Sequence, residues 1–122
     1  NLVVKGVLDT DDAVALKAAG VDAVQVSSHG ARQLEGAPAP ISVLPAMRAA
    51  LGPDYPIFFD SGLQSGEDAL KAFNQGADFA FFGRILQFAI AAAGEAGLEQ
   101  LWDVLSDELS IAMAQTGITT PV

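Results

Sequence analysis

Short apolar runs alternate along the chain with segments of helical spacing. The runs typical of strands are Leu2–Val4, Ala23–Val26, Ile57–Phe59 and Phe79–Phe82. Each is followed by a segment in which apolar residues recur at three- and four-residue steps, as on one face of a helix. The predicted order is β-α-β-α-β-α-β-α-α, which favours parallel strands joined by right-handed crossovers.

The helix boundaries carry their own signals. Asp9 or Thr10 can cap a helix over residues 11–19, and Ser65 can cap one over residues 67–75. A further helix is predicted over residues 43–51. Near the end of the chain, one apolar stripe predicts a long helix that faces the core. The stripe consists of Leu98, Leu101, Trp102, Leu105, Leu109, Ala112 and Met113.

The chain contains an internal repeat with an offset of 56 residues. This offset superposes Gly6, Asp12, Ala13, Gly20 and Asp22 on Gly62, Asp68, Ala69, Gly76 and Asp78 without a gap. Repeated βα units of this kind build (β/α)8 barrels, which need eight strands, and only four are predicted here. Three explanations stay open: a partner supplies the other half, the chain is a fragment, or the fold is an open four-stranded sheet.

Composition narrows the class of protein. The 122 residues suffice for a single domain, residues 1–122, and the net charge of -9 argues against a nucleic-acid partner. With no cysteine and one histidine, no metal site is predicted. No apolar segment reaches the roughly 20 residues of a transmembrane span, and we expect a cytoplasmic location. The start at Asn1 rather than methionine suggests the middle of a longer protein.

Polar and glycine residues follow each predicted strand. They are Lys5-Gly6, Ser27-Ser28-His29-Gly30, Asp60-Ser61-Gly62 and Gly83-Arg84. Because the carboxyl ends of parallel strands meet at one edge, these residues should share one mouth. Glycine loops that lead into helices can direct backbone N–H groups at a phosphate, and Arg84 adds a permanent charge.

The segment from Ser27 to Gln33 is the most informative, because it places the only histidine, His29, three residues before Arg32. A histidine with a pKa near its ordinary value of about 6.5 can act as a base, and a guanidinium binds a carboxylate with two hydrogen bonds. On these residues alone, the alternative is a structural histidine beside an arginine in a surface ion pair.

Together these residues resemble the C-terminal half of the FMN-dependent 2-hydroxy-acid-oxidising enzymes. That family includes glycolate oxidase, lactate oxidase, membrane-associated L-lactate dehydrogenase and flavocytochrome b2. The matching motifs are Lys5-Gly6, Val26–Leu34, Asp60-Ser61-Gly62, Gly76-Ala77-Asp78 and Gly83-Arg84, in the family's order. The resemblance implies a TIM-barrel-type fold, of which this chain would form the C-terminal half-barrel of four parallel strands with their helices.

The resemblance also implies roles for individual residues. His29 would be the base that takes a proton from an L-2-hydroxy acid, and Arg32 would bind the substrate carboxylate. Lys5 would face the pyrimidine edge of FMN, where positive charge stabilises the reduced flavin, and Ser27 would contact the flavin. The ribityl chain and phosphate would be held by Asp60, Ser61, Gly62, Leu63, Gln64, Gly83 and Arg84.

The chain departs from the family pattern at several positions. Ser28 stands where the family has asparagine, Ala31 where it has glycine, Glu35 where it has aspartate, and Gln64 where it has arginine. Without that arginine, we expect FMN affinity to fall by about one to two decades, the value of one charged hydrogen bond.

Three functions remain in competition. The first is an FMN-dependent dehydrogenase or oxidase of a small 2-hydroxy acid, associated with the membrane in some of the family. The second is a catalytically silent half-barrel that binds flavin or phosphate, and the third is a structural remnant. Because a half-barrel exposes two sheet edges and an apolar layer, we expect a homo-oligomer or pairing with a missing N-terminal half.

Overall fold

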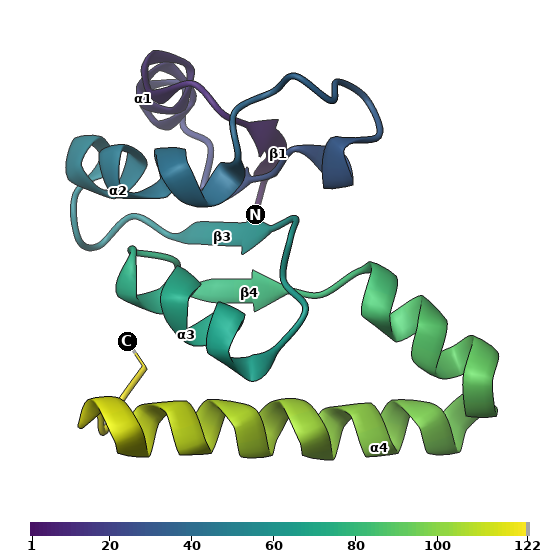
Figure 1. Cartoon of the computed structure of the whole chain (residues 1–122). Coiled ribbons are helices and arrows are strands. Elements are labelled where there is room, and N and C mark those ends of the chain that lie inside the picture. Colours follow the sequence, from purple (N-terminus) through teal and green to yellow (C-terminus); the bar gives the residue numbers. More distant parts are fainter. Residues whose placement is uncertain (122) are drawn as a thin grey trace.

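The computed structural model describes residues 1–121 and shows the alternating pattern that the sequence predicts (Figure 1). Its elements, in order, are β1 (Val3–Val7), α1 (Thr10–Ala18), β2 (Ala23–Val26), a 3-10 turn (His29–Ala31), α2 (Pro40–Leu51), β3 (Ile57–Asp60), α3 (Gly66–Asn74), β4 (Phe79–Phe81) and α4 (Arg84–Thr116). The 3-10 turn was not predicted. The helix α2 begins three residues before the predicted start, because Pro40 fits the first turn of a helix.

The four strands form one parallel sheet in the order β1-β2-β3-β4. Within residues 1–121 the sheet is open, with β1 and β4 at its edges. The prediction that Lys5 and Gly6 follow the first strand is wrong. Both lie inside β1, which continues to Val7 with a register shift after Lys5. That irregularity turns the strand and allows a glycine with φ of +93° in its interior.

The predicted repeat is present in three dimensions. The helices α1 and α3 have nine residues each and begin at positions 56 residues apart. Each is capped at the equivalent position, because the side chains of Asp9 and Ser65 accept hydrogen bonds from first-turn N–H groups. The repeated Asp22 and Asp78 also act alike. The carboxylate of Asp22 accepts a hydrogen bond from the backbone N–H of Leu2, just before β1, and that of Asp78 from the N–H of Ile57, at the start of β3.

The main core lies between one face of the sheet and the helices. Val24, Val26, Ile57 and Phe59 from β2 and β3 pack with Leu44 and Met47 of α2, all of them at most 1% exposed. Strand residues alternate between faces, so the intervening residues point to the opposite side. That side, which we call the open face, consists of Lys5, Gln25, Phe58, Asp60, Phe79 and Phe81.

The open face carries an exposed aromatic cluster. The rings of Phe58, Phe79 and Phe81 contact one another, with centroids 4.9 to 6.2 Å apart. Phe79 remains 53% exposed and Phe81 41% exposed, although both lie on a sheet. Large apolar side chains next to a free strand edge are typical of a surface that is covered in an assembly.

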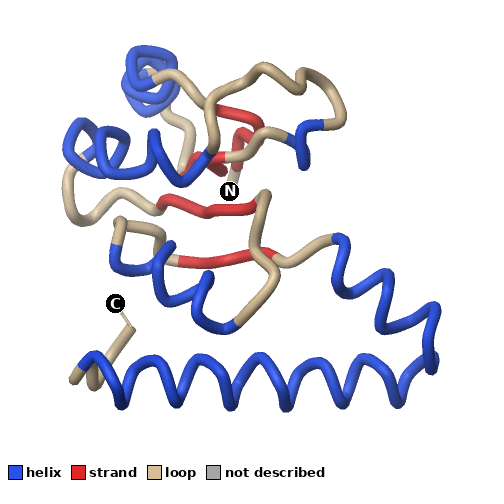
Figure 2. Tube along the Cα trace, viewed as in Figure 1, coloured by secondary structure: helices blue, strands red, loops and turns tan. Residues whose placement is uncertain are grey.

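The helix α4 has two limbs that meet at Ala93 and Gly94, where the backbone leaves helical geometry and the chain turns back (Figure 2). The second limb packs on α3, so the prediction of two terminal helices is confirmed. The predicted core-facing stripe is wrong at Trp102. Leu105 is buried against α3, whereas Trp102 is 72% exposed. Within residues 1–121, no helix is both long enough and apolar enough to cross a membrane.

Candidate functional site

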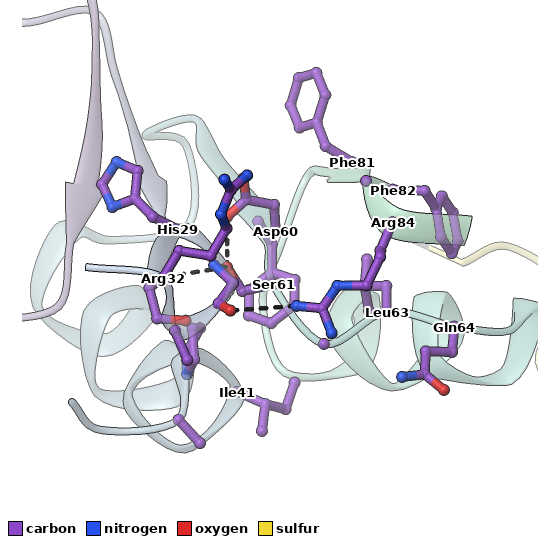
Figure 3. A pocket seen from close by; sticks show the side chains of 18 of the residues that line it. His29, Arg32, Ile41, Asp60, Ser61, Leu63, Gln64, Phe81, Phe82 and Arg84 are labelled. Carbon is purple, nitrogen blue, oxygen red and sulfur yellow. Dashed lines mark hydrogen bonds between the residues drawn. The ribbon is translucent and has the colours of Figure 1, made fainter. Parts of the chain in front are cut away.

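The polar residues predicted to share a mouth come together in one open cleft of about 1280 Å³ at the carboxyl end of the sheet (Figure 3). The predicted site residues that line it are Lys5, His29, Arg32, Asp60, Ser61, Gly62, Leu63, Gln64, Gly83 and Arg84. Of the predicted set, only Ser27 is fully buried beneath the surface of the cleft. The parallel topology explains this convergence, because it brings the ends of β2, β3 and β4 to the same edge.

The cleft concentrates positive charge in an acidic protein. Four of the chain's six lysines and arginines line it, namely Lys5, Arg32, Lys71 and Arg84, but only three of its fifteen carboxylates do, namely Glu35, Asp60 and Asp68. Two of those carboxylates are already paired with lysines, at 2.9 and 3.1 Å. Within residues 1–121, Arg32 and Arg84 have no carboxylate partner. Two unpaired guanidinium groups therefore face a cleft that suits a ligand with anionic groups.

A polar network crosses the open face beneath the cleft. The Lys5 ammonium lies 2.9 Å from Asp60 Oδ2 and donates a hydrogen bond to Ser27 Oγ at 2.8 Å. Gln25 also donates to Asp60 Oδ2, at 3.1 Å. Burial alone would raise the pKa of Asp60. The hydrogen-bonding groups of Ser27, Lys5 and Ser61, together with the charge of Lys5, outweigh burial and hold that pKa below its ordinary value. The network therefore contains an ionised carboxylate that fixes the position of Lys5.

Ser27 does not reach the surface of the cleft. Its hydroxyl accepts hydrogen bonds from Lys5 Nζ and from the backbone N–H of His29, at 2.8 and 3.0 Å. Both acceptor positions of the oxygen are therefore in use. In this arrangement Ser27 orients Lys5 and the start of the following loop.

His29 lies at the first position of the 3-10 turn, with a φ of +55°. Its imidazole is directed toward β1 (Figure 3), where it rests on the bare backbone of Gly6. A Cβ atom on Gly6 would lie 2.5 Å from Cε1 of the ring, so the glycine provides the space that the imidazole occupies. Sequence reasoning assigned no separate role to Gly6. A glycine inside a strand next to the only histidine is the pattern that could have indicated it.

Arg32 and Arg84 approach the cleft from different elements. Arg32 caps the 3-10 turn, three residues after His29. Arg84 begins α4, and its Nη2 donates a hydrogen bond to the carbonyl of Gly30 at 3.3 Å (Figure 3). That bond ties the segment after β4 to the loop after β2. Because it uses one of five guanidinium donors, Arg84 keeps most of its capacity for an anion.

The glycines on either side of the cleft leave their backbone accessible. A Cβ atom on Gly62 or Gly83 would meet no other atom within 4 Å and would project into open space. An anionic group could therefore approach the backbone closely at both positions. At Gln64 the backbone N–H already donates to Asp68 Oδ2 at 3.1 Å, which leaves its neutral side-chain amide to face a ligand.

The cleft also has apolar walls that sequence reasoning did not anticipate. Leu34, Ile41, Phe81 and Phe88 line it together with the polar residues. They come from a loop, the start of a helix, an edge strand and α4, so no single sequence motif connects them. An apolar wall opposite a cationic rim suits a ligand that combines a planar ring with anionic groups.

Comparison with known proteins places these features in a family. The family described as FMN-dependent dehydrogenase matches residues 1–121. An L-lactate oxidase from Alicycliphilus denitrificans is 46% identical over 114 residues, which cover 93% of this chain and 31% of that protein. The 2-hydroxyacid oxidase 1 of Mus musculus is 43% identical over 116 residues, 95% of this chain and 31% of that protein.

Solved structures agree with this assignment. A protein described as a lactate oxidase from Pediococcus acidilactici superposes with a TM-score of 0.93 at 38% identity, over 98% of this chain and 33% of that one. A mandelate oxidase superposes with a TM-score of 0.88 at 40% identity, over 92% of this chain and 33% of that one. The chain therefore spans about a third of the length of the relatives it matches.

Proposed function

The chain belongs to the FMN-dependent dehydrogenase family, and on that premise we propose that it serves the oxidation of an L-2-hydroxy acid to the 2-oxo acid. The observation that carries this proposal is the cationic cleft, which gathers four of six basic residues in a chain with a net charge of -9. Both ligands of the reaction carry anionic groups: a phosphate on FMN and a carboxylate on the substrate. The relatives named L-lactate oxidase and L-lactate dehydrogenase favour a lactate-like substrate.

The residues of the cleft fit FMN. Arg84 and the accessible backbone of Gly62 and Gly83 would hold the phosphate, with Asp60, Leu63 and Gln64 beside the ribityl chain. Lys5 would lie at the flavin ring, and Ser27, buried beneath the cleft, would orient it. When bound, FMN supplies the acceptor for the two electrons that leave the substrate. Lys5 is already held in place by Asp60, so its positive charge would lie at the flavin ring without further reorganisation.

His29 and Arg32 act on the substrate in this proposal. Oxidation of the alcohol removes two electrons and two protons. The two electrons and one proton would pass to FMN, and His29 would accept the other proton as general base. Arg32 binds the carboxylate with paired hydrogen bonds and thereby orients the carbon that is oxidised. The two side chains come from one short turn, so the turn that presents the base also fixes its distance from the carboxylate site.

The roles of the two unpaired arginines can be separated experimentally. Arg84→Met should weaken FMN binding about 10- to 100-fold, the value of one charged hydrogen bond, and Arg32→Met should leave it unchanged. Quenching of flavin fluorescence measures the first effect. For L-lactate, measured by its effect on the spectrum of bound FMN, Arg32→Met should weaken binding by a similar factor. Lys71→Met is the matched control, because Lys71 lines the cleft but is paired with Asp68. Equal effects of all three variants on both ligands would contradict the proposal.

A second function, a half-barrel that binds flavin or phosphate without turnover, is favoured by the open face. Phe79 and Phe81 are exposed there beside a free strand edge. We propose that either a second copy of the chain or a missing N-terminal half covers this face and completes the barrel. If the chain binds FMN but L-lactate and glycolate do not bleach it, the silent function holds. Bleaching that is lost in His29→Ala supports the enzyme.

A further inference from the structure

The hydroxyl of Ser61 is fully used by hydrogen bonds within the protein. It accepts from the backbone N–H of Ser28 at 3.2 Å and from that of Gly30 at 3.1 Å, and it donates to Asp60 Oδ1 at 3.0 Å. A hydroxyl offers one donor and two acceptor positions, so no capacity remains for a ligand. The oxygen of Ser27, at 3.5 Å, is at the limit of hydrogen-bond distance and adds little.

The loop that Ser61 binds has a conformation that requires support. Three consecutive residues, His29, Gly30 and Ala31, have φ of +55°, +68° and +61°. This region is unfavourable for residues with a Cβ atom, and two of the three have one. The N–H groups of Ser28 and Gly30, on either side of His29, both point at Ser61 Oγ, while that of His29 points at Ser27 Oγ. Two hydroxyls therefore hold three successive amides.

Ser61 itself has a strained backbone. Its φ is +79°, at a position where glycine would fit without cost. Glycine would remove this cost but would also lose what the side chain contributes. The contribution visible here is the acceptor for two N–H groups of the loop, placed 33 and 31 residues away in the sequence. Through Asp60, the same hydroxyl is connected to Lys5 on β1.

We propose that Ser61 is a positioning residue that fixes the His29 loop before any ligand binds, rather than a group that contacts FMN. This inference rests on the proposed function only in assigning His29 as the base. The network from Lys5 through Asp60 and Ser61 to the loop then sets the flavin-facing ammonium and the histidine in one rigid arrangement.

The test is carried out on the chain without FMN. Ser61→Ala removes the hydroxyl, and amide hydrogen exchange at Ser28 and Gly30 should accelerate roughly 3- to 10-fold, the value of one neutral hydrogen bond. The ring resonance of His29 should also shift, and it is unambiguous because the chain has one histidine. Ser65→Ala is the control, since it removes a helix-capping hydroxyl from the same segment without touching the loop.

Ser61→Gly separates positioning from backbone strain. It removes the hydroxyl but relieves the strain of the positive φ. We therefore expect it to loosen the loop as Ser61→Ala does while being at least as stable as Ser61→Ala. It also provides the test if Ser61→Ala fails to fold. Unchanged exchange and an unmoved His29 resonance in either variant would overturn the proposal. Unchanged exchange with FMN affinity reduced tenfold would instead assign Ser61 to the cofactor. If the unsubstituted chain does not bind FMN, the proposed function is contradicted. The hydrogen-exchange result would still decide whether Ser61 positions the loop.

Discussion

Replacement of Gly6 by alanine should displace the proposed base without unfolding the protein. The new Cβ would lie 2.5 Å from Cε1 of His29, whereas ordinary contact begins at 3.4 Å, so the ring must retreat by about 1 Å. A displacement of about 1 Å at a reacting group can cost on the order of 10²-fold in rate. Because His29 is exposed, the imidazole can swing away, and relieving the overlap should itself cost little stability.

The backbone cost of this substitution has a matched control in the same chain. Gly6 and Gly20 have φ of +93° and +87°, so alanine at either position should cost about 1–2 kcal/mol of unfolding free energy. A Cβ on Gly20, however, would meet no atom within 4 Å. Gly20→Ala therefore reproduces the strain of Gly6→Ala without the contact with His29.

The assay combines three measurements on both variants. Urea denaturation should give similar losses of stability, the His29 ring resonance should shift only in Gly6→Ala, and the rate at which L-lactate bleaches bound FMN should fall only in Gly6→Ala. The role of Gly6 in placing His29 is refuted if the His29 resonance stays in place in Gly6→Ala. It is also refuted if Gly6→Ala is far less stable than Gly20→Ala, because the ring would then be unable to move.

Three further substitutions test the framework that positions the site. Arg48→Met should cost about 3–5 kcal/mol in urea denaturation, because the largely buried guanidinium pairs with Asp78 at 2.6 Å and binds four backbone carbonyls; a loss below 1 kcal/mol would contradict this. Asp60→Asn should flatten the acid limb of the stability curve. The pKa of Asp60 is lowered by folding, so the stability it contributes is present above about pH 5 and is lost as pH falls through the folded pKa; an unchanged acid limb would count against this. Gly66→Ala should destabilise the contact between α3 and α4, because a Cβ there would overlap the backbone of α4. A thermal midpoint equal to that of the unsubstituted chain would contradict this prediction.

Much of the fold was predictable because local signals agree with the tertiary structure. The strand runs, the caps at Asp9 and Ser65 and the repeat at an offset of 56 residues all indicate one βα unit that occurs twice. The end of β1 was not predictable in this way, because Gly6 is a weak strand former and the bulge that accommodates it depends on the pairing with β2. The exposure of Trp102 was likewise not predictable, since an apolar stripe on a helix does not reveal how much of it the neighbouring helix covers.

The residues of the candidate site were predictable from the sequence, but the contacts among them were not. Parallel topology is enough to place His29 and Asp60 at one edge of the sheet, and the structure does so. Two contacts depend on backbone conformations with positive φ: that of Ser61 with the loop after β2, and that of His29 with Gly6. Sequence periodicity carries no information on such conformations, because they arise from contacts between segments far apart in the chain.

Size-exclusion chromatography of the chain after incubation with FMN tests whether the cleft binds FMN and whether a second copy covers the open face. Light scattering gives the mass, and absorbance is read in both the protein band and the visible flavin band. We predict that flavin absorbance co-elutes with protein at the mass of two chains, because the cationic cleft would bind FMN and, in the absence of an N-terminal half, a second copy would cover the open face. A monodisperse, flavin-free species at the mass of one chain would contradict this prediction.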